Sequence, residues 1–196
     1  MRFFSAIRAI YFKLHEELPP WLTYHTLEHT KDVYRMARQI GIAEGLDEHE
    51  LKLILTATML HDVGFIDGTD FHEKRSCVTA NKMLPQFGYS EEDIFNVVRL
   101  IMATEIPHHP GTIIEKVICD ADLDYLGRPD FFELAEKLFE ELKYLGVVKN
   151  RIEWNKIQVK FLHQHQYFTS TAIDSRRALK NEHLLAIMNE LASGKE

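Results

Sequence analysis

Long uncharged apolar runs are missing from this sequence, and their absence argues against membrane-spanning helices. No stretch of roughly 18 apolar residues, about the length needed to cross a bilayer, occurs without a charge. An excess of positive charge is missing too: 23 Lys and Arg stand against 30 Asp and Glu, a formal net charge of −7. Without a basic field the chain does not attract a nucleic acid polymer or an anionic membrane. We expect neither as a partner.

Cysteine is also scarce. The chain has two, Cys77 and Cys119, which lie far apart in apolar segments. They cannot form a disulfide framework, and they lack the close spacing of a thiolate metal site. We expect both to be reduced core residues of a cytoplasmic protein.

The alternation of Val, Ile and Thr that marks β-strands is missing, as are internal repeats, linkers and low-complexity segments. Helical signals dominate instead, in the form of apolar periodicity interrupted by proline, glycine and N-capping residues. The 196 residues are enough to bury one core. The prediction is an all-α fold with a single domain, residues 1–196.

Nine helices are predicted, with a loop at 63–69 between the third and the fourth. Their approximate ranges are 2–17, 26–43, 47–62, 70–87, 90–106, 113–126 and 130–146, then one that begins at 150 and one from 171 to the C-terminus. Asp70 and Thr171 are predicted to cap the fourth and ninth helices. The mixed charges from Glu133 to Lys143 predict a solvated face, and Trp154 is expected in the core or in a pocket wall.

Metal-binding side chains gather at two places in the first third of the chain. His25 and His29 stand four residues apart, which puts both on one helix face. His61 and Asp62 follow the largely apolar run 51–60, in which Lys52 is the only charged residue. A buried ionised Asp costs several kcal/mol unless it is paired or bound to a cation. A buried His-Asp hydrogen bond and a metal site both satisfy that requirement, and the dipeptide alone does not choose between them.

A third group lies further along the chain. Asp120, Asp122 and Asp124 fall within an otherwise apolar segment, and no Lys or Arg occurs between Lys116 and Arg128. Clustered carboxylates among buried apolar residues need a counter-charge. A divalent cation would supply it.

Taken in order, these groups resemble the HD-domain superfamily of metal-dependent phosphohydrolases. The superfamily pattern is a His, then an adjacent His-Asp pair, then a distant Asp, all on helices; His29, His61, Asp62 and Asp122 match it in order. The resemblance covers roughly residues 24–127, and the segment 118–127 is similar to the last motif of the small bacterial members. It implies a helical bundle of the HD-domain type, with the motif-bearing core at about 24–127 and further helices at about 130–192 packed on it.

The resemblance also implies a ligand set. His29, His61, Asp62 and Asp122 would hold one divalent ion, for which Mn, Fe, Co, Ni, Zn and Mg are candidates. Asp62 would in addition orient the attacking water, and His25 would protonate the leaving oxygen. The alternative for His25 is a hydrogen bond that ties down the loop before its helix.

One departure from the family concerns phosphate binding. Many members follow the His-Asp pair with Gly-Lys, and that lysine contacts phosphate, whereas here the residues are Val63-Gly64-Phe65. Lys74, Arg75 and Arg128 are the candidate replacements, and each has the alternative of a solvated surface charge. His72 is a candidate for contact with the substrate or with the metal ligands.

A second ion would require His72 together with His108 or His109. Pro107 and Pro110 predict an exposed turn that projects His108 and His109 outward, so we expect a mononuclear site.

The prediction is a metal-dependent phosphohydrolase of the HD type. It would act on a nucleotide or another small phosphate ester by attack of a metal-activated water, with the substrate class implied by resemblance alone. Two alternatives are a di-iron HD-type oxygenase and a non-catalytic helical module stabilised by metal. The oligomeric state is left open.

Overall fold

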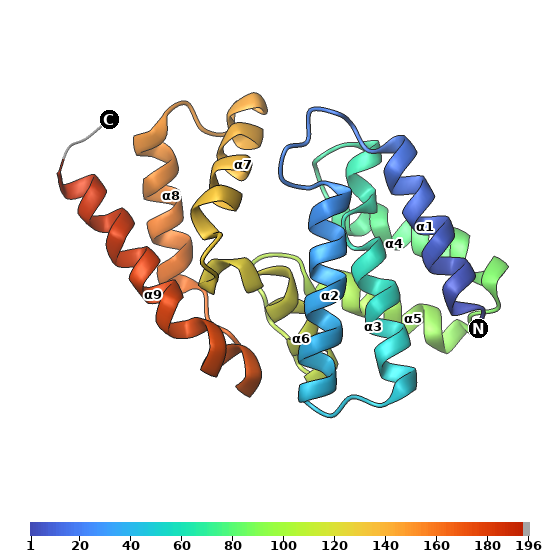
Figure 1. Cartoon of the computed structure of the whole chain (residues 1–196). Coiled ribbons are helices and arrows are strands. Elements are labelled where there is room, and N and C mark those ends of the chain that lie inside the picture. The colour runs from blue at the N-terminus through green and yellow to red at the C-terminus, as the bar shows by residue number, and fades with distance from the viewer. Residues whose placement is uncertain (194–196) are drawn as a thin grey trace.

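The structure of residues 1–193 is a computed structural model, and every regular element in that range is a helix (Figure 1). The all-α prediction is therefore confirmed. The nine α-helices are α1 (Phe3–Glu17), α2 (Leu27–Ala43), α3 (Glu48–Leu60), α4 (His72–Met83), α5 (Glu91–Ala103), α6 (Ile113–Asp122), α7 (Phe131–Tyr144), α8 (Arg151–Gln164) and α9 (Ser170–Ala192). Three 3-10 helices join them: η1 (Val63–Asp67), η2 (Leu84–Phe87) and η3 (Asp124–Gly127).

The structure corrects several predicted bounds. The predicted loop at 63–69 is wrong, since it contains η1, whose C-cap is Gly68 with a φ of +130°. Two predicted helices are each an α-helix followed by a 3-10 turn: η2 follows α4 at Pro85, which has no N–H to donate, and η3 follows α6. Asp70 does not cap α4; Phe71 precedes that helix in the left-handed conformation. The N-cap of α9 is Thr169, not Thr171.

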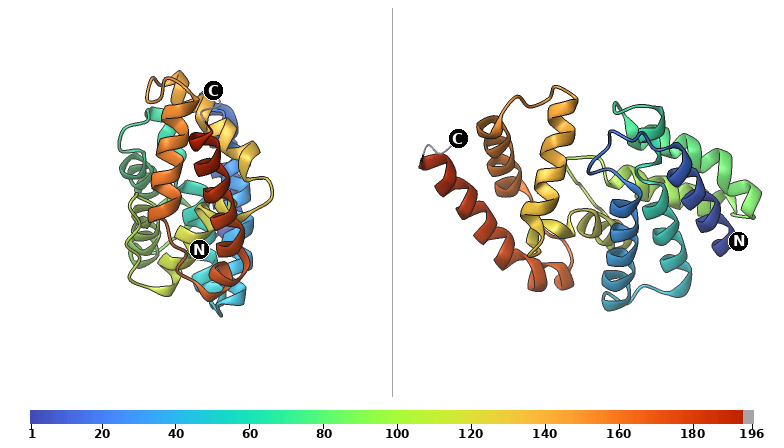
Figure 2. Two further views of the ribbon diagram at one scale, coloured as in Figure 1. Left: turned by 90° about the vertical axis from the view of Figure 1, so that its left-hand side faces the viewer. Right: turned by 45° about the horizontal axis from the view of Figure 1, so that its top comes forward.

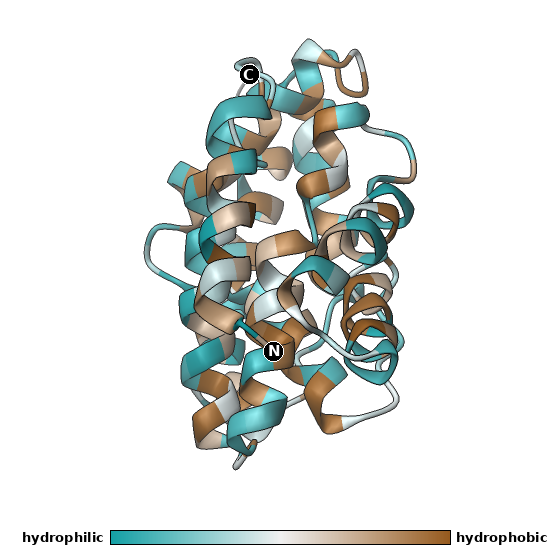
Figure 3. Ribbon diagram, turned by 90° about the vertical axis from the view of Figure 1, so that its right-hand side faces the viewer, coloured by the Kyte–Doolittle hydropathy of each residue, from teal (hydrophilic) through white to brown (hydrophobic). Residues whose placement is uncertain are grey.

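Helices α1–α6 bury one apolar cluster, and α3 runs through it. All eight residues from Leu53 to Leu60 are buried, as expected for a helix that is apolar on every side. α3 packs against α1, α2 and α5, which surround it in Figure 1. On the face shown in Figure 3 the outer helices interleave hydrophilic and hydrophobic positions, so these helices are amphipathic.

Helices α7–α9 form a second group beside the first, and the right-hand view in Figure 2 shows the two side by side. They bury their own apolar cluster, which includes Phe131, Phe139, Trp154 and Ile187. The second group meets the first where α9 packs on η3 and α2. Gly127 permits that contact, because a Cβ there would stand 2.3 Å from the carbonyl oxygen of Arg176 on α9.

Within residues 1–193, no helix has both the length and the apolar character needed to cross a membrane.

Candidate metal centre

His61 stands just after α3, and its ring is fixed by one hydrogen bond. Its Nδ1 lies 2.7 Å from the carbonyl oxygen of Thr58. A carbonyl only accepts, so Nδ1 carries a proton, and Nε2 has a lone pair to offer whenever the ring is neutral. The side chain is 1% exposed, and Nε2 has no hydrogen-bond partner. Burying a polar atom without a partner costs free energy, so Nε2 requires a further explanation.

Asp62 shares the site with its neighbour because the helix has already ended. Its backbone has left the helical region, with φ −104° and ψ 4°, and its Oδ2 lies 3.2 Å from His61 Nε2. The Ser76 hydroxyl holds this turn: it donates to the His61 carbonyl at 2.6 Å and accepts from Gly64 N–H at 2.9 Å. A Cβ at Gly64 would stand 2.0 Å from the His72 carbonyl oxygen. The close packing of η1 on α4 therefore requires glycine at this position.

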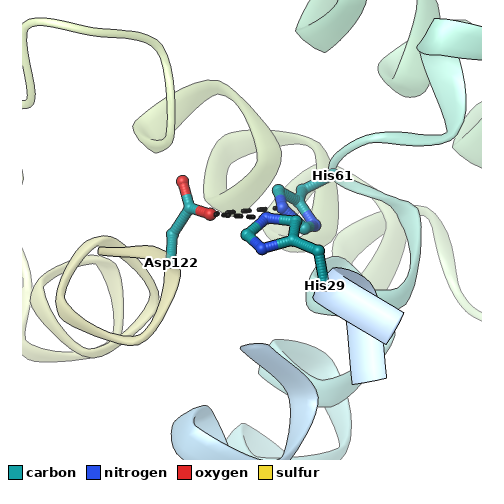
Figure 4. A group of neighbouring side chains, drawn as sticks. All are labelled: His29, His61 and Asp122. Carbon is teal, nitrogen blue, oxygen red and sulfur yellow. Dashed lines mark ion pairs between the residues drawn. The ribbon is translucent and has the colours of Figure 1, made fainter. Parts of the chain in front are cut away.

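The other two predicted ligands arrive from α2 and α6. His29 Nε2 lies 3.2 Å from Asp122 Oδ1 and 3.4 Å from Asp62 Oδ2. His61 Nε2 lies 3.4 Å from Asp122 Oδ1. His29, His61 and Asp122 thus form a group whose ligand atoms all lie within 4.8 Å of one another, and Figure 4 shows the carboxylate of Asp122 directed at both imidazoles.

These separations suit ligands around one ion. Donor atoms bound at about 2.1 Å stand about 3.0 Å apart at octahedral angles and about 3.4 Å apart at tetrahedral angles. A hydrogen bond between imidazolium and carboxylate is shorter, about 2.7–2.9 Å. Asp62 Oδ2 is buried without a hydrogen-bond partner, like His61 Nε2. Two imidazole nitrogens and two carboxylate oxygens match the donor set of a borderline divalent cation, so the residues fit the metal that the sequence implies.

The electrostatics of the site favour its charged forms. Burial alone lowers the pKa of His61, but the carboxylates of Asp62 and Asp122 outweigh burial and raise it well above its ordinary value. Burial raises the pKa of Asp122, whereas His29 and His61 pull it well below the usual range. The pKa of Asp62 is lowered in the same way, chiefly by His61. Two buried carboxylates therefore remain ionised, and a bound cation would take the place of the proton that they favour on His61.

The carboxylates on either side of Asp122 have other partners, which corrects the expectation of a shared counter-ion for all three. Asp120, fully buried, accepts hydrogen bonds from the backbone N–H groups of Phe168 and Thr169. Asp124 pairs with Arg176 at 2.8 Å, and Arg128 lies 3.5 Å from it. The arginine and the N–H groups come from segments more than 40 residues away in sequence. Asp122 alone faces the histidines.

His25 is held beside the site by Glu141 of α7. Its Nδ1 hydrogen-bonds to Glu141 Oε1, while Glu141 Oε2 accepts from the N–H groups of Thr23, Tyr24 and His25 at 2.9, 2.8 and 3.1 Å. Burial lowers the pKa of His25, but the bond to Glu141 and the nearby carboxylates raise it overall. The predicted alternative, a bond that ties down this loop, is thus present, and it leaves Nε2 free for another role.

Glu141 was missed in the sequence, where the face from Glu133 to Lys143 was expected to be solvated. That expectation is wrong at this position, since Glu141 is 1% exposed. The spacing of Glu141 indicates that it is buried, because it continues the apolar stripe of Leu134 and Leu138 along one side of α7. A carboxylate on an apolar stripe indicates a buried partner.

His72 lies next to the ligands. It is the first residue of α4, its Nε2 stands 3.5 Å from Asp62 Oδ1, and its ring stacks on Phe65 with centroids 4.2 Å apart. Phe65 also stacks on His25, with centroids 4.3 Å apart. The rings of His25 and His72 lie 6.3 Å apart, so Phe65 holds the two histidines near each other.

The three candidate phosphate contacts do not present a free cation to the ligands. Lys74 is exposed and lies over the ring of Phe71, with Nζ 4.7 Å from its centroid. Arg75 lies against Gly68. Neither lines a cavity that the ligands line. Arg128 is close to His29 and Asp122 in space, but it is paired with Asp32 at 2.5 Å and Asp130 at 2.9 Å.

His108 and His109 lie apart from the ligands. The predicted outward turn is correct for His109, which is exposed, and wrong for His108, which is half-buried. His108 Nε2 donates to the Thr104 carbonyl at 3.2 Å, and burial lowers its pKa. Both rings line a separate cavity of about 220 Å³, together with His165.

A cavity of about 530 Å³ opens onto the candidate ligands. His29, Asp62 and Asp122 line it together with His25 and His72, and apolar side chains from α7 and α8 form another part of its wall. This volume is typical of sites for small molecules. A second cavity of about 390 Å³ reaches His29 and Asp122 as well, and Arg128 lies in its wall.

Three solved structures are similar to the chain along almost its whole length. A predicted HD superfamily hydrolase from an uncultured Thermotogales bacterium has a TM-score of 0.63 and 20% identity, covering 96% of this chain and 92% of that one. Lin1889 from Listeria innocua has a TM-score of 0.66 and 19% identity, covering 100% of both chains. YpgQ from Bacillus subtilis, solved in complex with ADP, has a TM-score of 0.63 and 19% identity, covering 94% and 97%. At these identities the likeness establishes the fold.

No curated protein sequence matches the chain. The sequence does match the family model for the HD domain over residues 26–125, just over half of its 196 residues. That range contains all four candidate ligands and the helices that carry them. The chain belongs to the HD-domain family.

Proposed function

We propose that this protein is a metal-dependent phosphohydrolase. It hydrolyses a nucleotide or another small phosphate ester, using one divalent ion held by His29, His61, Asp62 and Asp122. Membership of the HD-domain family supports a hydrolase, and the similar YpgQ structure contains ADP.

One observation carries the proposal. His61 Nε2 and Asp62 Oδ2 are buried without hydrogen-bond partners, and His29 and Asp122 converge on the same point. A site that only held helices together would form short, saturated hydrogen bonds here. Unpaired nitrogen and oxygen atoms that can ligate a metal support a bound cation, and the adjoining cavity supports a substrate beside it.

A divalent ion at this position supplies Lewis-acid polarisation of a phosphoryl oxygen and lowers the pKa of a water molecule. The protein's own groups do the rest. Asp62 directs Oδ2 at the ligand cluster and Oδ1 toward His72, so Oδ1 can accept a hydrogen bond from the attacking water. His25, with Nδ1 bound to Glu141, presents Nε2 as the proton donor for the leaving oxygen.

The di-iron oxygenase needs a second set of ligands. His72 stands near Asp62 Oδ1, as a bridging arrangement requires, but His108 is bonded to Thr104 and lines another cavity. Among residues 1–193, one group of three or more convergent ligands occurs. These observations favour the mononuclear hydrolase.

The test is phosphate release from nitrophenyl phosphate and from nucleoside mono-, di- and triphosphates, each assayed with Mn, Fe, Co, Ni, Zn and Mg. We expect release that depends on the added ion and is abolished by Asp122→Asn. Asp67→Asn, an exposed carboxylate on η1, is the matched control and should keep full activity. Release without any ion, or unchanged release from Asp122→Asn, would contradict the proposal, and oxygen uptake coupled to product would favour the oxygenase.

A further inference from the structure

Two neutral polar atoms on α8 are buried without partners. Trp154 is 4% exposed and Gln158 is 8% exposed, and neither the indole Nε1 nor the amide Oε1 has a hydrogen-bond partner. The two residues stand four apart on one helix and therefore lie on the same face. Burying a polar group without a partner costs free energy, so a pair on one face calls for an explanation.

The orientation of the Gln158 amide is set by a neighbour. Its Nε2 donates to Asn155 Oδ1 at 3.2 Å, which leaves Oε1 as the open atom. The pair therefore offers one donor, Trp154 N–H, and one acceptor, Gln158 C=O.

Both residues line the 530 Å³ cavity that His29, Asp62 and Asp122 also line. Around them the wall is apolar, with Leu138 and Leu142 from α7 and Ile157 and Phe161 from α8. We refer to this part of the cavity, between α7 and α8, as the α7/α8 chamber. It lies outside residues 26–125, the range of the HD-domain match.

The charge of the cavity limits what the chamber can hold. The lining contains no Lys or Arg among the described residues, whereas five carboxylates take part in it: Asp62, Asp70, Glu73, Glu105 and Asp122. An anionic group placed away from the metal ligands would find no counter-charge there. An uncharged occupant avoids that cost.

We infer that the α7/α8 chamber binds the organic part of the phosphate ester, and that Trp154 and Gln158 select it. The occupant is a flat, uncharged ring with a hydrogen-bond acceptor next to a donor on one edge. Trp154 Nε1 donates to the acceptor, Gln158 Oε1 accepts from the donor, and the leucine and aromatic walls cover the faces of the ring. This inference rests on the proposed function for its phosphate, but not for the binding of the ring.

The first experiment measures binding without phosphate or metal. The chain has two tryptophans, so Trp21→Phe leaves Trp154 as the only indole, and its fluorescence reports on the chamber. The probes are uridine and inosine, each compared with its N-methylated form, 3-methyluridine or 1-methylinosine, in which the ring N–H is blocked. We expect saturable quenching by at least one parent nucleoside and about tenfold weaker binding of its methylated form, the worth of about one hydrogen bond. No binding of either parent, or equal binding of parent and methylated form, would overturn the inference.

The second experiment measures turnover. Trp154→Phe removes the indole N–H, and Gln158→Leu removes the whole amide, including the Nε2 that donates to Asn155; each puts an apolar side chain in its place. For the 5′-monophosphate of the nucleoside that binds, each should raise KM about tenfold and leave kcat nearly unchanged. Phenyl phosphate, which has a ring without donor or acceptor, should be affected less than about twofold by either variant. Equal losses on both substrates would mean that these residues are structural and would overturn the inference.

The two proposals can fail separately. Nucleoside binding with no turnover of any phosphate ester would uphold the chamber and contradict the phosphohydrolase. Turnover of nucleotides with no nucleoside binding and no effect of Gln158→Leu would do the reverse.

Discussion

Helices α1–α6 and helices α7–α9 both bury polar atoms that have no partner, but the chemistry of those atoms differs. In the first group, His61 Nε2 and Asp62 Oδ2 belong to ionisable side chains whose neighbours favour the charged forms. In the second group, Trp154 and Gln158 are neutral, and the imidazole of His165 is kept neutral because burial lowers its pKa to about 3. Ionisable donors suit a cation and a phosphate, whereas neutral ones suit an uncharged ring.

This difference suggests that two parts of the 530 Å³ cavity have different roles, one in phosphate chemistry and one in substrate selection. Under the proposed function, α1–α6 supply the groups that act on phosphate, and α7–α8 supply the wall that chooses what the phosphate is attached to. Buried carboxylates connect the two groups of helices. Glu141 of α7 accepts hydrogen bonds from the loop before α2, and Asp120 of α6 accepts them from the start of α9. Substitutions in one group should therefore change chemistry, and substitutions in the other should change selection or stability.

The largest effect is expected from Asp122→Ala. It removes an oxygen ligand that faces both His29 and His61. Metal affinity should therefore fall by more than about 100-fold, which exceeds the usual loss when a residue that only hydrogen-bonds to a ligand is removed. The purified wild type should retain or take up about one ion per chain, and the variant should retain almost none. Elemental analysis after dialysis against a metal buffer measures this.

Asp124→Ala is the matched contrast, two residues further along. It should leave metal content unchanged but lower the free energy of unfolding by about 3 kcal/mol, because Arg176 and Arg128 lose a buried partner. Full metal content in Asp122→Ala would refute the assignment of Asp122 as a ligand. Loss of metal in Asp124→Ala would show that Asp124 also takes part in metal binding.

The next effect concerns His25. If His25 protonates the leaving oxygen, His25→Ala should keep its metal and lose roughly 10²–10⁴-fold in kcat on alkyl phosphates. The loss should be much smaller with nitrophenyl phosphate, whose leaving group needs no proton. An equal loss on both substrates would instead indicate that His25 serves only to fix its loop, through its hydrogen bond to Glu141.

The smallest effect belongs to α7–α9 and is seen in acid. The folded protein keeps His165 neutral down to about pH 3, because burial and then Lys180 and His108 lower its pKa, whereas the unfolded chain takes up a proton near pH 6.5. Between these values the unfolded state binds more protons, so the free energy of unfolding falls as pH falls. By about pH 5 this should cost roughly 1–2 kcal/mol.

His165→Leu removes that titration, so its free energy of unfolding should fall by roughly 1–2 kcal/mol less than that of the wild type between about pH 7.5 and pH 5. Urea unfolding with EDTA present measures the difference without a contribution from metal loss. Parallel curves for the two proteins would show that His165 is not held neutral.

Residues close in sequence account for most of what could be predicted. The N-caps Asp47, Ser90 and Asn150 each accept from the N–H three residues on, as their spacing predicts. Helical periodicity gave the all-α fold, and the buried α3 placed His61 and Asp62 at its end. The ligand roles of His29, His61, Asp62 and Asp122 remain predictions, although the structure brings the four together.

What the sequence by itself determined is local: where helices begin and end, which faces are apolar, and which side chains can bind a metal. These follow from interactions within one or two helical turns. The motif match already indicated Asp122 among the three neighbouring carboxylates, but only the tertiary structure gave Asp120 and Asp124 their own partners, which come from α9 and the segment just before it. The same holds for Glu141, whose partners lie 116–118 residues away, and for the α7/α8 chamber. Such contacts depend on how whole helices pack: the apolar stripe of α7 indicates that Glu141 is buried, but no short pattern indicates which groups it contacts.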